Sequence, residues 1–509
     1  MGGVVNPDEL QAEVERLQAE LTKKKEQLSE KDRYIELLEG RLRALQRHSF
    51  GRSSERFADQ PRLPFPGDEP EPETPDFAKD VPDDEERDTD HKRKPRRRRG
   101  ATRIPKDLPR VREEIPVTDE QRRCPCGCEM VQIGEEVTEV LEYQPASFFV
   151  REIVRPKLAC KHHEEHGVIT PELPPRPIPK GMAGPSLLAQ VVTAKYKDHL
   201  PLHRQHGIYK RHGVELAEST MVDWIRGVAD LAQPIVSAVR DSILSRDIVS
   251  TDDTPICVLD REHPKGSRKG FLWAYLGTSG EVVFDFTASR GRDGPRTFFG
   301  DYKGFIQADA YSGYNVLFES ADRIEVGCWA HARRGFHKAL DTEPEHAKQA
   351  IAAIRVLYDI ERQADEAGMD ADVRRELRVQ QSAPLLEDFK PWLEAIQSQV
   401  LPKSQLGKAL GYTLRQWDAL SRFVDDGRLK LDNNRCERAI RQVAIGRKNW
   451  MFAGSDEGGR RAAALYSLIG GCIELKVDPF AYLSEVLQRG AEGEDPVQLT
   501  PLAWASAQD

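Results

Sequence analysis

One short stretch, residues 303–314, restricts the possible folds of this chain more than any other. Residues 305–308 are mostly apolar and have the pattern of a short buried β-strand. The strand runs directly into Asp309, and Gly313 marks a turn just after it. A carboxylate at a strand end is held in place by the sheet, and hard divalent cations require oxygen ligands of this kind. The stretch therefore predicts a sheet that presents Asp309 as a metal ligand.

A second acidic position lies in an earlier β-rich run, residues 248–259, which contains Asp252 and Asp253. Because side chains alternate between the two faces of a strand, only one of these acids can point into a site. We assign Asp252 to the site and Asp253 to a supporting role, with Asp253 as the substitute if the register is shifted by one residue. The other strands are predicted at residues 271–277, 282–287 and 324–329.

A further acid, Glu437, lies on a helix predicted after the last strand. Asp432 or Asn433 can cap this helix, which places Glu437 about one turn from its start. The separation from Asp309 is 437 − 309 = 128 positions, and helical periodicity recurs within it, so we expect a helical insertion at about residues 338–430. The alternative for any one of the three acids is a solvated surface carboxylate, the default in a chain with 84 Asp and Glu residues.

Basic and aromatic residues accompany these acids. His331 follows the last strand, and we expect it either to contact a scissile phosphate or to be a buried structural histidine. Trp450 is expected to stack on a base or sugar, or to belong to the core. The predicted nucleic-acid contacts in this part of the chain are His331, Arg333, Arg334, Arg438, Arg441, Arg447, Lys448 and Trp450.

Residues 1–48 have the pattern of a coiled coil. Apolar residues recur at an alternating four-three spacing from Leu10 to Leu45. Lys24 and Lys31 occupy two seam positions, where polar residues set register or oligomer state at a cost in stability. The pattern predicts a homo-oligomer held together by this coil. The alternative is a single amphipathic helix packed on its own domain.

Residues 49–113 are predicted to form a linker. Its first part, up to about residue 90, is rich in proline and acidic residues and has few apolar residues that could form a core. The charge then reverses into a basic run, which suits DNA phosphate contacts with counterion release. The alternative is a solvated tail that only balances the acidic part. The predicted DNA contacts here are Lys92, Arg96, Arg97, Arg98 and Arg99.

Residues 114–180 contain four of the eight cysteines, in a pattern that favours a metal site over disulfides. Three cysteines lie within residues 124–128, and the fourth follows two strand-like runs, at 137–143 and 148–154. Thiolates and imidazoles brought together by a β-hairpin would hold a structural Zn²⁺. The spacing is irregular, so the ligand set is ambiguous, and the alternative is reduced cysteines without metal. The candidate ligands are Cys124, Cys126, Cys128, Cys160 and His163, with His162 or His166 as substitutes.

Residues 181–246 are predicted to be helical. A turn at Gly213 separates the last two helices, and Ser219 or Thr220 is expected to cap the final one. A helix-turn-helix pair can place its second helix in the major groove of DNA. The alternative is an ordinary pair of packed helices. The helical runs are residues 187–196, 202–210 and 220–229.

Length and charge limit the classes of protein that remain. A chain of 509 residues is too long for one core and suggests three or four domains. The net charge of −9 excludes a uniformly basic protein, but the charge is segregated, so local basic patches remain available to bind nucleic acid. The sequence has no apolar run that approaches the roughly 18 residues of a membrane span and no leader pattern, so we expect a cytoplasmic, nucleoid-associated protein.

Several segments resemble the IS66-type family of bacterial insertion-sequence transposases, which belongs to the DDE superfamily. The resemblance covers nearly the whole chain. The segments are "FGRSSE" at 50–55, "KGMAGPSLLAQVVTAKYKDHLPLHRQ" at 180–205, "QADAYSGYN" at 307–315, "CWAHARRGF" at 328–336, "DNNRCERAIR" at 432–441 and the glycine-rich run at 446–469.

This resemblance implies a multi-domain α+β protein. Residues 247–470 would form an RNase H-like (retroviral-integrase-like) DDE catalytic domain with the helical insertion, followed by a helical tail at 471–509. In that fold the first strand lies beside the fourth, which would place Asp252 next to Asp309. The resemblance also favours zinc binding in residues 114–180 and implies accessory proteins encoded by the same mobile element.

We therefore expect a DNA transposase that binds terminal inverted repeats and cleaves and joins DNA. Asp252, Asp309 and Glu437 would be its catalytic residues and would hold two Mg²⁺ or Mn²⁺ ions, which stabilise the entering and leaving oxygens of a phosphodiester reaction. One alternative is an inactive or repurposed DNA-binding protein, and the three intact acids argue against it. Another is an RNase H-like nuclease without strand transfer.

Overall fold

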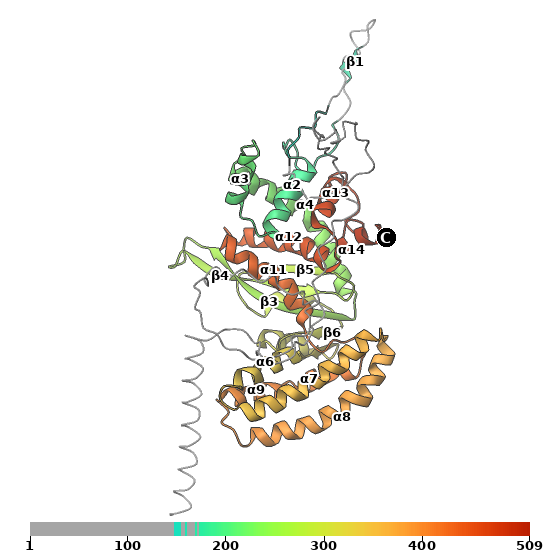
Figure 1. Ribbon diagram of the computed structural model, residues 1–509. Coiled ribbons are helices and arrows are strands. Elements are labelled where there is room, and N and C mark those ends of the chain that lie inside the picture. Colours follow the sequence, from blue (N-terminus) through green and yellow to red (C-terminus); the bar gives the residue numbers. More distant parts are fainter. Residues whose placement is uncertain (1–146, 154–157, 160–167, 170–172, 509) are drawn as a thin grey trace, which may run out of the picture. The chain divides into compact units, whose positions relative to one another are not determined.

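The computed structural model describes residues 147–153, 158–159, 168–169 and 173–508 (Figure 1). The predicted coiled coil, the linker with its basic run and every candidate zinc ligand lie outside these residues.

One prediction near the zinc region is wrong. Residues 148–153 form no strand, and Phe149 and Val150 are 81% and 89% exposed. The apolar pattern suggested a strand, but an extended segment becomes one only where a second segment pairs with it. A short antiparallel pair is formed instead by β1 (Leu158–Ala159) and β2 (Val168–Ile169).

Five strands form one mixed sheet in the order β5-β4-β3-β6-β7. β3, β4 and β5 are antiparallel neighbours, whereas β6 and β7 run parallel to β3. All five predicted strands are confirmed, with ends shifted by four residues or fewer. The strands are β3 (Ile248–Leu259), β4 (Ser267–Leu276), β5 (Val282–Thr287), β6 (Gly304–Gln307) and β7 (Arg323–Val326).

Helices cover the sheet because its central strands are apolar on both faces. In β4 all residues from Leu272 to Leu276 are buried, which requires cover on both sides. α11 (Asn434–Trp450) packs on β3 and β4, and α12 (Asp456–Glu474) packs on β5. Two shorter elements, α5 (Asp293–Phe299) and the 3₁₀ helix η2 (Ser312–Glu319), connect the strands.

The predicted helical region contains α2 (Pro185–Tyr196), α3 (Leu202–Arg211) and α4 (Glu218–Leu244). The glycine turn between α3 and α4 is confirmed, with φ of +84° at Gly213. The predicted cap was wrong, because α4 already begins at Glu218 after Ala217 and therefore contains Ser219 and Thr220. α4 also extends well past residue 229, since its buried face continues and packs on β5 and α12.

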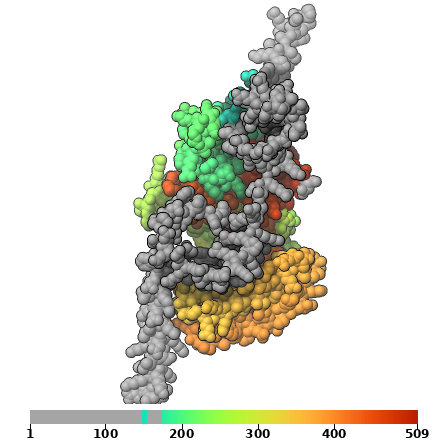
Figure 2. Space-filling view, in the orientation of Figure 1, coloured from blue at the N-terminus to red at the C-terminus, as the bar shows by residue number. Residues whose placement is uncertain are grey.

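The expected helical insertion is confirmed between β7 and α11. It forms a layer of helices drawn in yellow and orange in Figures 1 and 2. Its core is aromatic: the ring of Trp329 lies 6.3 Å from that of Phe389 and 6.0 Å from that of Trp417. The helices are α6 (Trp329–Ala339), α7 (Pro344–Glu366), α8 (Ala371–Gln397), α9 (Gln405–Arg415), α10 (Trp417–Ser421) and the 3₁₀ helix η3 (Arg422–Val424).

Charged residues are also buried in this insertion, and we call Glu361, Arg374 and Arg378 the buried arginine cluster. Arg378 is fully buried, and its guanidinium donates to both oxygens of Glu361 at 2.7 Å. It also donates to the backbone oxygens of Phe423, Asp426 and Leu429. The cluster therefore fastens the segment that leads into α11 to helices α7 and α8.

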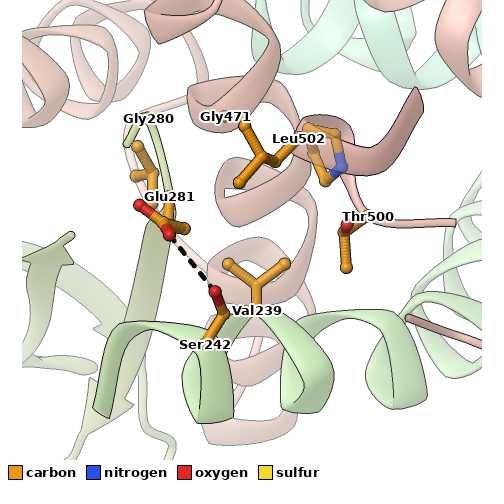
Figure 3. Close-up of a pocket in the computed structure, with 9 residues that line it drawn as sticks. Val239, Ser242, Gly280, Glu281, Gly471, Thr500 and Leu502 are labelled. Carbon is orange, nitrogen blue, oxygen red and sulfur yellow. Dashed lines mark hydrogen bonds between the residues drawn. The ribbon is translucent and has the colours of Figure 1, made fainter. Parts of the chain in front are cut away.

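The chain ends in α13 (Pro479–Ala491) and α14 (Pro501–Ser506). A crevice of about 30 Å³ lies among α4, β5 and α14 (Figure 3). There Glu281 accepts hydrogen bonds from Ser242 Oγ at 3.2 Å and Arg246 Nε at 2.8 Å. The crevice has room for about one water, and its acid is already paired, so we interpret it as a gap in packing.

Within the described part of the chain, none of the helices combines the length and the apolar character needed to cross a membrane.

Candidate active site

The sheet places the first two predicted acids side by side. β3 and β6 are parallel neighbours, with Ser250 paired to Gln307. Asp252 and Asp309 each lie two residues beyond this pair, in the same chain direction. Asp252 lies within β3 and Asp309 just beyond the end of β6, and the charge of Asp309 contributes to the raised pKa of Asp252, so the two carboxylates are neighbours.

The surroundings of Asp252 are unfavourable for its charge. Burial and, to a smaller extent, the neighbouring carboxylates of Asp309, Glu437 and Asp253 together raise the pKa of its carboxyl to about 7, although a hydrogen bond from the backbone N–H of Asp253 lowers it. That N–H donates to Asp252 Oδ1 at 2.8 Å. Negative charge therefore gathers around Asp252, and no cationic side chain contributes to the shift of its pKa.

Asp309 begins an irregular turn after β6. Its Oδ1 accepts a hydrogen bond from the backbone N–H of Tyr311 at 3.1 Å, while Ala310 between them has a φ of +61°. The backbone oxygen of Asp309 accepts from the Tyr412 hydroxyl of α9 at 3.5 Å. The turn is thus held by its own acid and by the insertion.

Glu437 lies in the first turn of α11, as predicted. Asn433 is the N-cap residue, but the side chain that accepts a helical N–H is that of Asp432, which bonds Asn434 N at 3.0 Å. The amide of Asn433 instead donates to the backbone oxygen of Thr251 at 2.9 Å. Because Thr251 directly precedes Asp252, this bond fixes the start of α11 to the strand that carries the first acid.

Two residues of α6 face Glu437. Arg334 donates to its Oε2 at 3.1 Å, and His331 Nε2 lies 3.7 Å from its Oε1. Burial and the nearby Arg334 lower the pKa of His331. His331 Nδ1 is buried and makes no hydrogen bond within the described residues. His331 and Arg334 therefore lie beside the acids, as expected, but in this structure they contact Glu437.

A divalent cation fits the chemistry of this donor set, although the side chains are not arranged as a finished shell. Within the described residues, no three His, Cys, Asp or Glu side chains form a group that could hold a metal ion. The raised pKa of Asp252 nevertheless shows uncompensated negative charge beside Asp309. Mg²⁺ commonly binds one or two carboxylates and completes its shell with water and substrate oxygens. We call Asp252, Asp309 and Glu437 the acid cluster.

Sequence reasoning missed one residue beside the cluster, Arg290. Its guanidinium makes a bidentate ion pair with Asp253 at 2.7–2.9 Å and lies 3.9 Å from the centre of the Tyr311 ring. The Tyr311 hydroxyl in turn donates to the Arg290 backbone oxygen. Asp253 is therefore engaged by Arg290, and its supporting role stays a prediction. The Asp253 side chain is only 2% exposed, and a buried carboxylate needs a cationic partner. Two adjacent acids within a buried strand could therefore have indicated in the sequence that a residue such as Arg290 lies nearby.

The other predicted nucleic-acid contacts divide into exposed and structural residues. Arg438, Arg441 and Lys448 are exposed on α11, and Arg333 is half-buried on α6. Arg447 is turned inward and donates to Thr254 Oγ1 at 2.8 Å and to the Pro255 backbone oxygen. Trp450 is half-buried with its indole nitrogen buried beside the Tyr466 hydroxyl, which favours the core alternative for its role.

A cleft of about 500 Å³ lies at the start of β3, and none of the three acids lines it. It reaches Ser250, two residues before Asp252, and Asp432, at the start of α11. Its lining also contains cationic side chains, and burial lowers the pKa of one of them, Lys430. The cationic lining residues are Arg246, Arg428, Lys430 and Arg435.

Comparison with protein families defines the class of this protein as a transposase. The model of the transposase IS66 family matches residues 180–461, which include all three acids. A model described as the zinc-finger binding domain of transposase IS66 matches residues 121–162, and one described as "Transposase C of IS166 homeodomain" matches residues 37–112.

The chain belongs to the transposase IS66 family, with an N-terminal leucine-zipper region and a zinc-finger region ahead of the main domain. It is similar to three uncharacterized proteins of Sinorhizobium fredii. The protein y4qI is 35% identical over 79% of this chain and 76% of its own length. The protein y4jD is 32% identical over 80% and 82%, and y4hP is 31% identical over 78% and 76%.

Proposed function

We propose that this transposase binds the terminal inverted repeats of its mobile element and catalyses metal-dependent DNA cleavage and strand transfer. The observation that carries the proposal is the equal offset of Asp252 and Asp309 from the Ser250–Gln307 pair on two adjacent parallel strands. Glu437 joins them because Asn433 bonds the backbone beside Asp252. We propose that these three acids, which come from remote parts of the chain, act together with the exposed cations near them.

The catalytic domain, residues 247–470, is proposed to be RNase H-like. The support is the strand order, in which three antiparallel strands are followed by two strands parallel to the first. The helical insertion then separates the fifth strand from the helix that carries Glu437. The remaining boundaries proposed are 1–48 for the coil, 49–113 for the linker, 114–180 for the zinc region, 181–246 for the helical region and 471–509 for the tail.

Each acid has a proposed role. Asp252 and Asp309 would hold divalent ions together, and Glu437 would complete the set after releasing Arg334 and His331. Two bound Mg²⁺ or Mn²⁺ ions would supply charge neutralisation in the phosphodiester transition state. Arg334, once released from Glu437, would contact the phosphate, and Arg438, Arg441 and Lys448, which are exposed on α11, would contact the DNA backbone.

The N-terminal third would supply assembly and further DNA contacts. The leucine-zipper region would join two copies so that both element ends are held together. The basic run at Lys92 and 96–99 would contact phosphates. Accessory proteins from the same element would act with the chain. We propose Cys124, Cys126, Cys128, Cys160 and His163 as the source of the zinc ligands.

The decisive experiment is an assay with purified full-length protein and DNA duplexes that copy the two ends of the element, with Mg²⁺ or Mn²⁺. Wild-type protein should nick these duplexes and join them to a target. Asp309→Asn should abolish both reactions and retain binding. Asp322→Asn is the matched control, because Asp322 is an exposed acid paired with Lys303 at 3.1 Å. Undiminished activity of Asp309→Asn would defeat the proposal, and cleavage without joining would indicate a nuclease.

Zinc is tested separately by metal analysis. Full-length protein dialysed against metal-free buffer should retain about one zinc per chain, since structural sites with thiolate ligands bind tightly. A variant in which Cys124, Cys126 and Cys128 are all serine should lose it, whereas Cys257→Ser should not. A wild-type protein with far less than one zinc would remove this part of the proposal.

A further inference from the structure

The C-terminal end of α11 carries an exposed apolar surface, which we call the Phe452 surface and define as Leu259, Met451 and Phe452. Their exposed fractions are 41%, 64% and 41%. Met451 has a φ of +59°, in the left-handed region that a non-glycine side chain adopts at a cost. The turn therefore presents two large apolar side chains to solvent in a strained conformation, although burial would be the favourable place for them.

This surface is fixed to the sheet. Ala453 N donates to the Cys257 oxygen at 2.8 Å, and Leu259 N donates to the Ala453 oxygen at 2.9 Å. Arg268 pairs with both Asp260 and Asp456, which joins the segment after Phe452 to the β3–β4 hairpin. The apolar side chains are thus held on a rigid support.

The charge around the surface is positive. β3 ends at Leu259, and the loop of the β3–β4 hairpin follows directly. Within residues 260–269, four cations stand against two acids, a net charge of 4 − 2 = +2. The exposed cations there are Arg261, Lys265 and Lys269. An apolar surface between cations suits a polyanion that has flat apolar faces, which describes nucleic acid.

α11 connects this surface with the acid cluster. Arg441 and Lys448 follow Glu437 by 4 and 11 positions, close to one and three helical turns, so all three lie on one face of the helix. Within α11, Trp450 follows Glu437 by 450 − 437 = 13 residues, or about 20 Å at the helical rise of about 1.5 Å, and Phe452 lies just beyond this end. A strand of duplex DNA advances about 3.4 Å per base pair, so this distance spans about six base pairs.

We infer that the Phe452 surface receives a base of the element-end DNA about six base pairs from the cleaved bond, unstacks it and holds it against Phe452. The inference rests on the proposed function and adds a site to it. The aromatic that meets the base is Phe452 rather than its neighbour Trp450, whose indole nitrogen is buried.

The test uses full-length protein and 40-base-pair duplexes that copy an element end, with the fluorescent base 2-aminopurine placed at successive positions from the terminus. Unstacking raises the emission of this base. Wild-type protein should raise it at least about two-fold at one position, four to eight base pairs from the cleaved bond. Phe452→Ala should lose the signal, and Phe452→Trp should keep it. Phe480→Ala, at another exposed phenylalanine (37%), should behave as wild type.

Binding anisotropy and thermal unfolding are measured on the same samples, so that a misfolded variant is recognised. If wild-type protein does not bind the duplex, the proposed function fails, and this inference fails with it. If wild-type protein binds and cleaves but no position shows the emission change, or Phe452→Ala retains it, only this inference is overturned. A change in the oligomeric mass of Phe452→Ala without loss of the emission signal would assign the surface to a second protein copy instead, which also overturns it.

Discussion

Charged side chains are buried in two places in this protein, and they differ in how their charge is balanced. In the buried arginine cluster, Glu361 faces two arginines, and Arg378 has a hydrogen-bond acceptor for each of its nitrogens. In the acid cluster, Asp252 lies among three other carboxylates. Glu437 pairs with Arg334 and the adjacent Asp253 pairs with Arg290, but burial and the neighbouring carboxylates still raise the pKa of Asp252. Because Arg374 also pairs with Asp365 at 2.6 Å, the arginine cluster is neutralised within the chain, whereas the acid cluster is left negative.

This difference in charge balance distinguishes buried charges that stabilise the fold from buried charges that serve a functional site. A buried charge without a partner is destabilising, so we expect a protein to retain one only where the charge is needed for function. The arginine cluster joins α7 and α8 to the segment before α11, which is a structural task. The acid cluster is completed by cations from outside the chain, in our proposal by the divalent ions. The following predictions test this contrast, from the largest expected effect to the smallest.

The same substitution should have opposite consequences in the two clusters. Glu437→Gln should reduce DNA cleavage by about 1000-fold or more, because a ligand of the reacting centre is lost, while stability changes by less than about 1 kcal/mol, since its pair with Arg334 is partly exposed. Glu361→Gln should destabilise the protein by about 3–5 kcal/mol, because it leaves buried arginines without their counter-charge.

Urea unfolding and a cleavage assay on both variants measure this prediction. Glu387→Gln, on the exposed side of α8, serves as the control for both assays. If Glu437→Gln were the unstable variant and Glu361→Gln the inactive but stable one, the contrast between the clusters would be reversed.

Removing the buried carboxylate of Asp252 should stabilise the metal-free protein at high pH. Its folded pKa of about 7 exceeds the ordinary 3.8, so the folded state binds more protons than the unfolded state, and stability falls as pH rises between these values. The full shift corresponds to about 4 kcal/mol, and partial solvent access reduces the expected gain for Asp252→Asn to on the order of 2 kcal/mol.

Urea titrations in EDTA provide the measurement. Wild type should approach the stability of Asp252→Asn near pH 4 and fall below it at pH 8. Added Mg²⁺ should stabilise wild type at pH 8 more than the variant. Equal stabilities at every pH would mean that the charge of Asp252 is compensated within the chain.

Arg290 should have the smallest effect, because it acts through neighbouring residues. Arg290→Lys keeps the positive charge near Asp253 but loses the bidentate geometry and the contact with Tyr311, so we expect DNA cleavage to fall about 10-fold. Arg290→Ala also loses the charge, so we expect cleavage to fall about 100-fold. The Mg²⁺ concentration at half-maximal rate should rise in both variants. Arg362→Ala, a surface pair with Asp359, should leave that concentration unchanged. An unchanged Mg²⁺ dependence in Arg290→Ala would remove its positioning role.

Local patterns predicted much of the sheet and its helices. β3 and β5 have the predicted ends, because alternation and turn residues are local signals. The cap of α4 was misplaced, since its start depends on packing rather than on Ser219 or Thr220. The strand expected at 148–154 is not formed at the described residues 148–153, because strand formation depends on a partner that the local sequence does not specify.

By itself, the sequence determined which residues could serve the site: an acid at the end of a buried strand, an acid pair within another and an acid one turn into a helix. Only the tertiary structure decided how they meet. The parallel register of β3 and β6 sets Asp252 beside Asp309, and Asn433 ties α11 to the same strand. It also decided that Arg290 balances Asp253 and that Phe452 rather than Trp450 faces solvent. The physical reason is that propensity and periodicity act over a few neighbouring residues, whereas charge balance and exposure depend on distant ones.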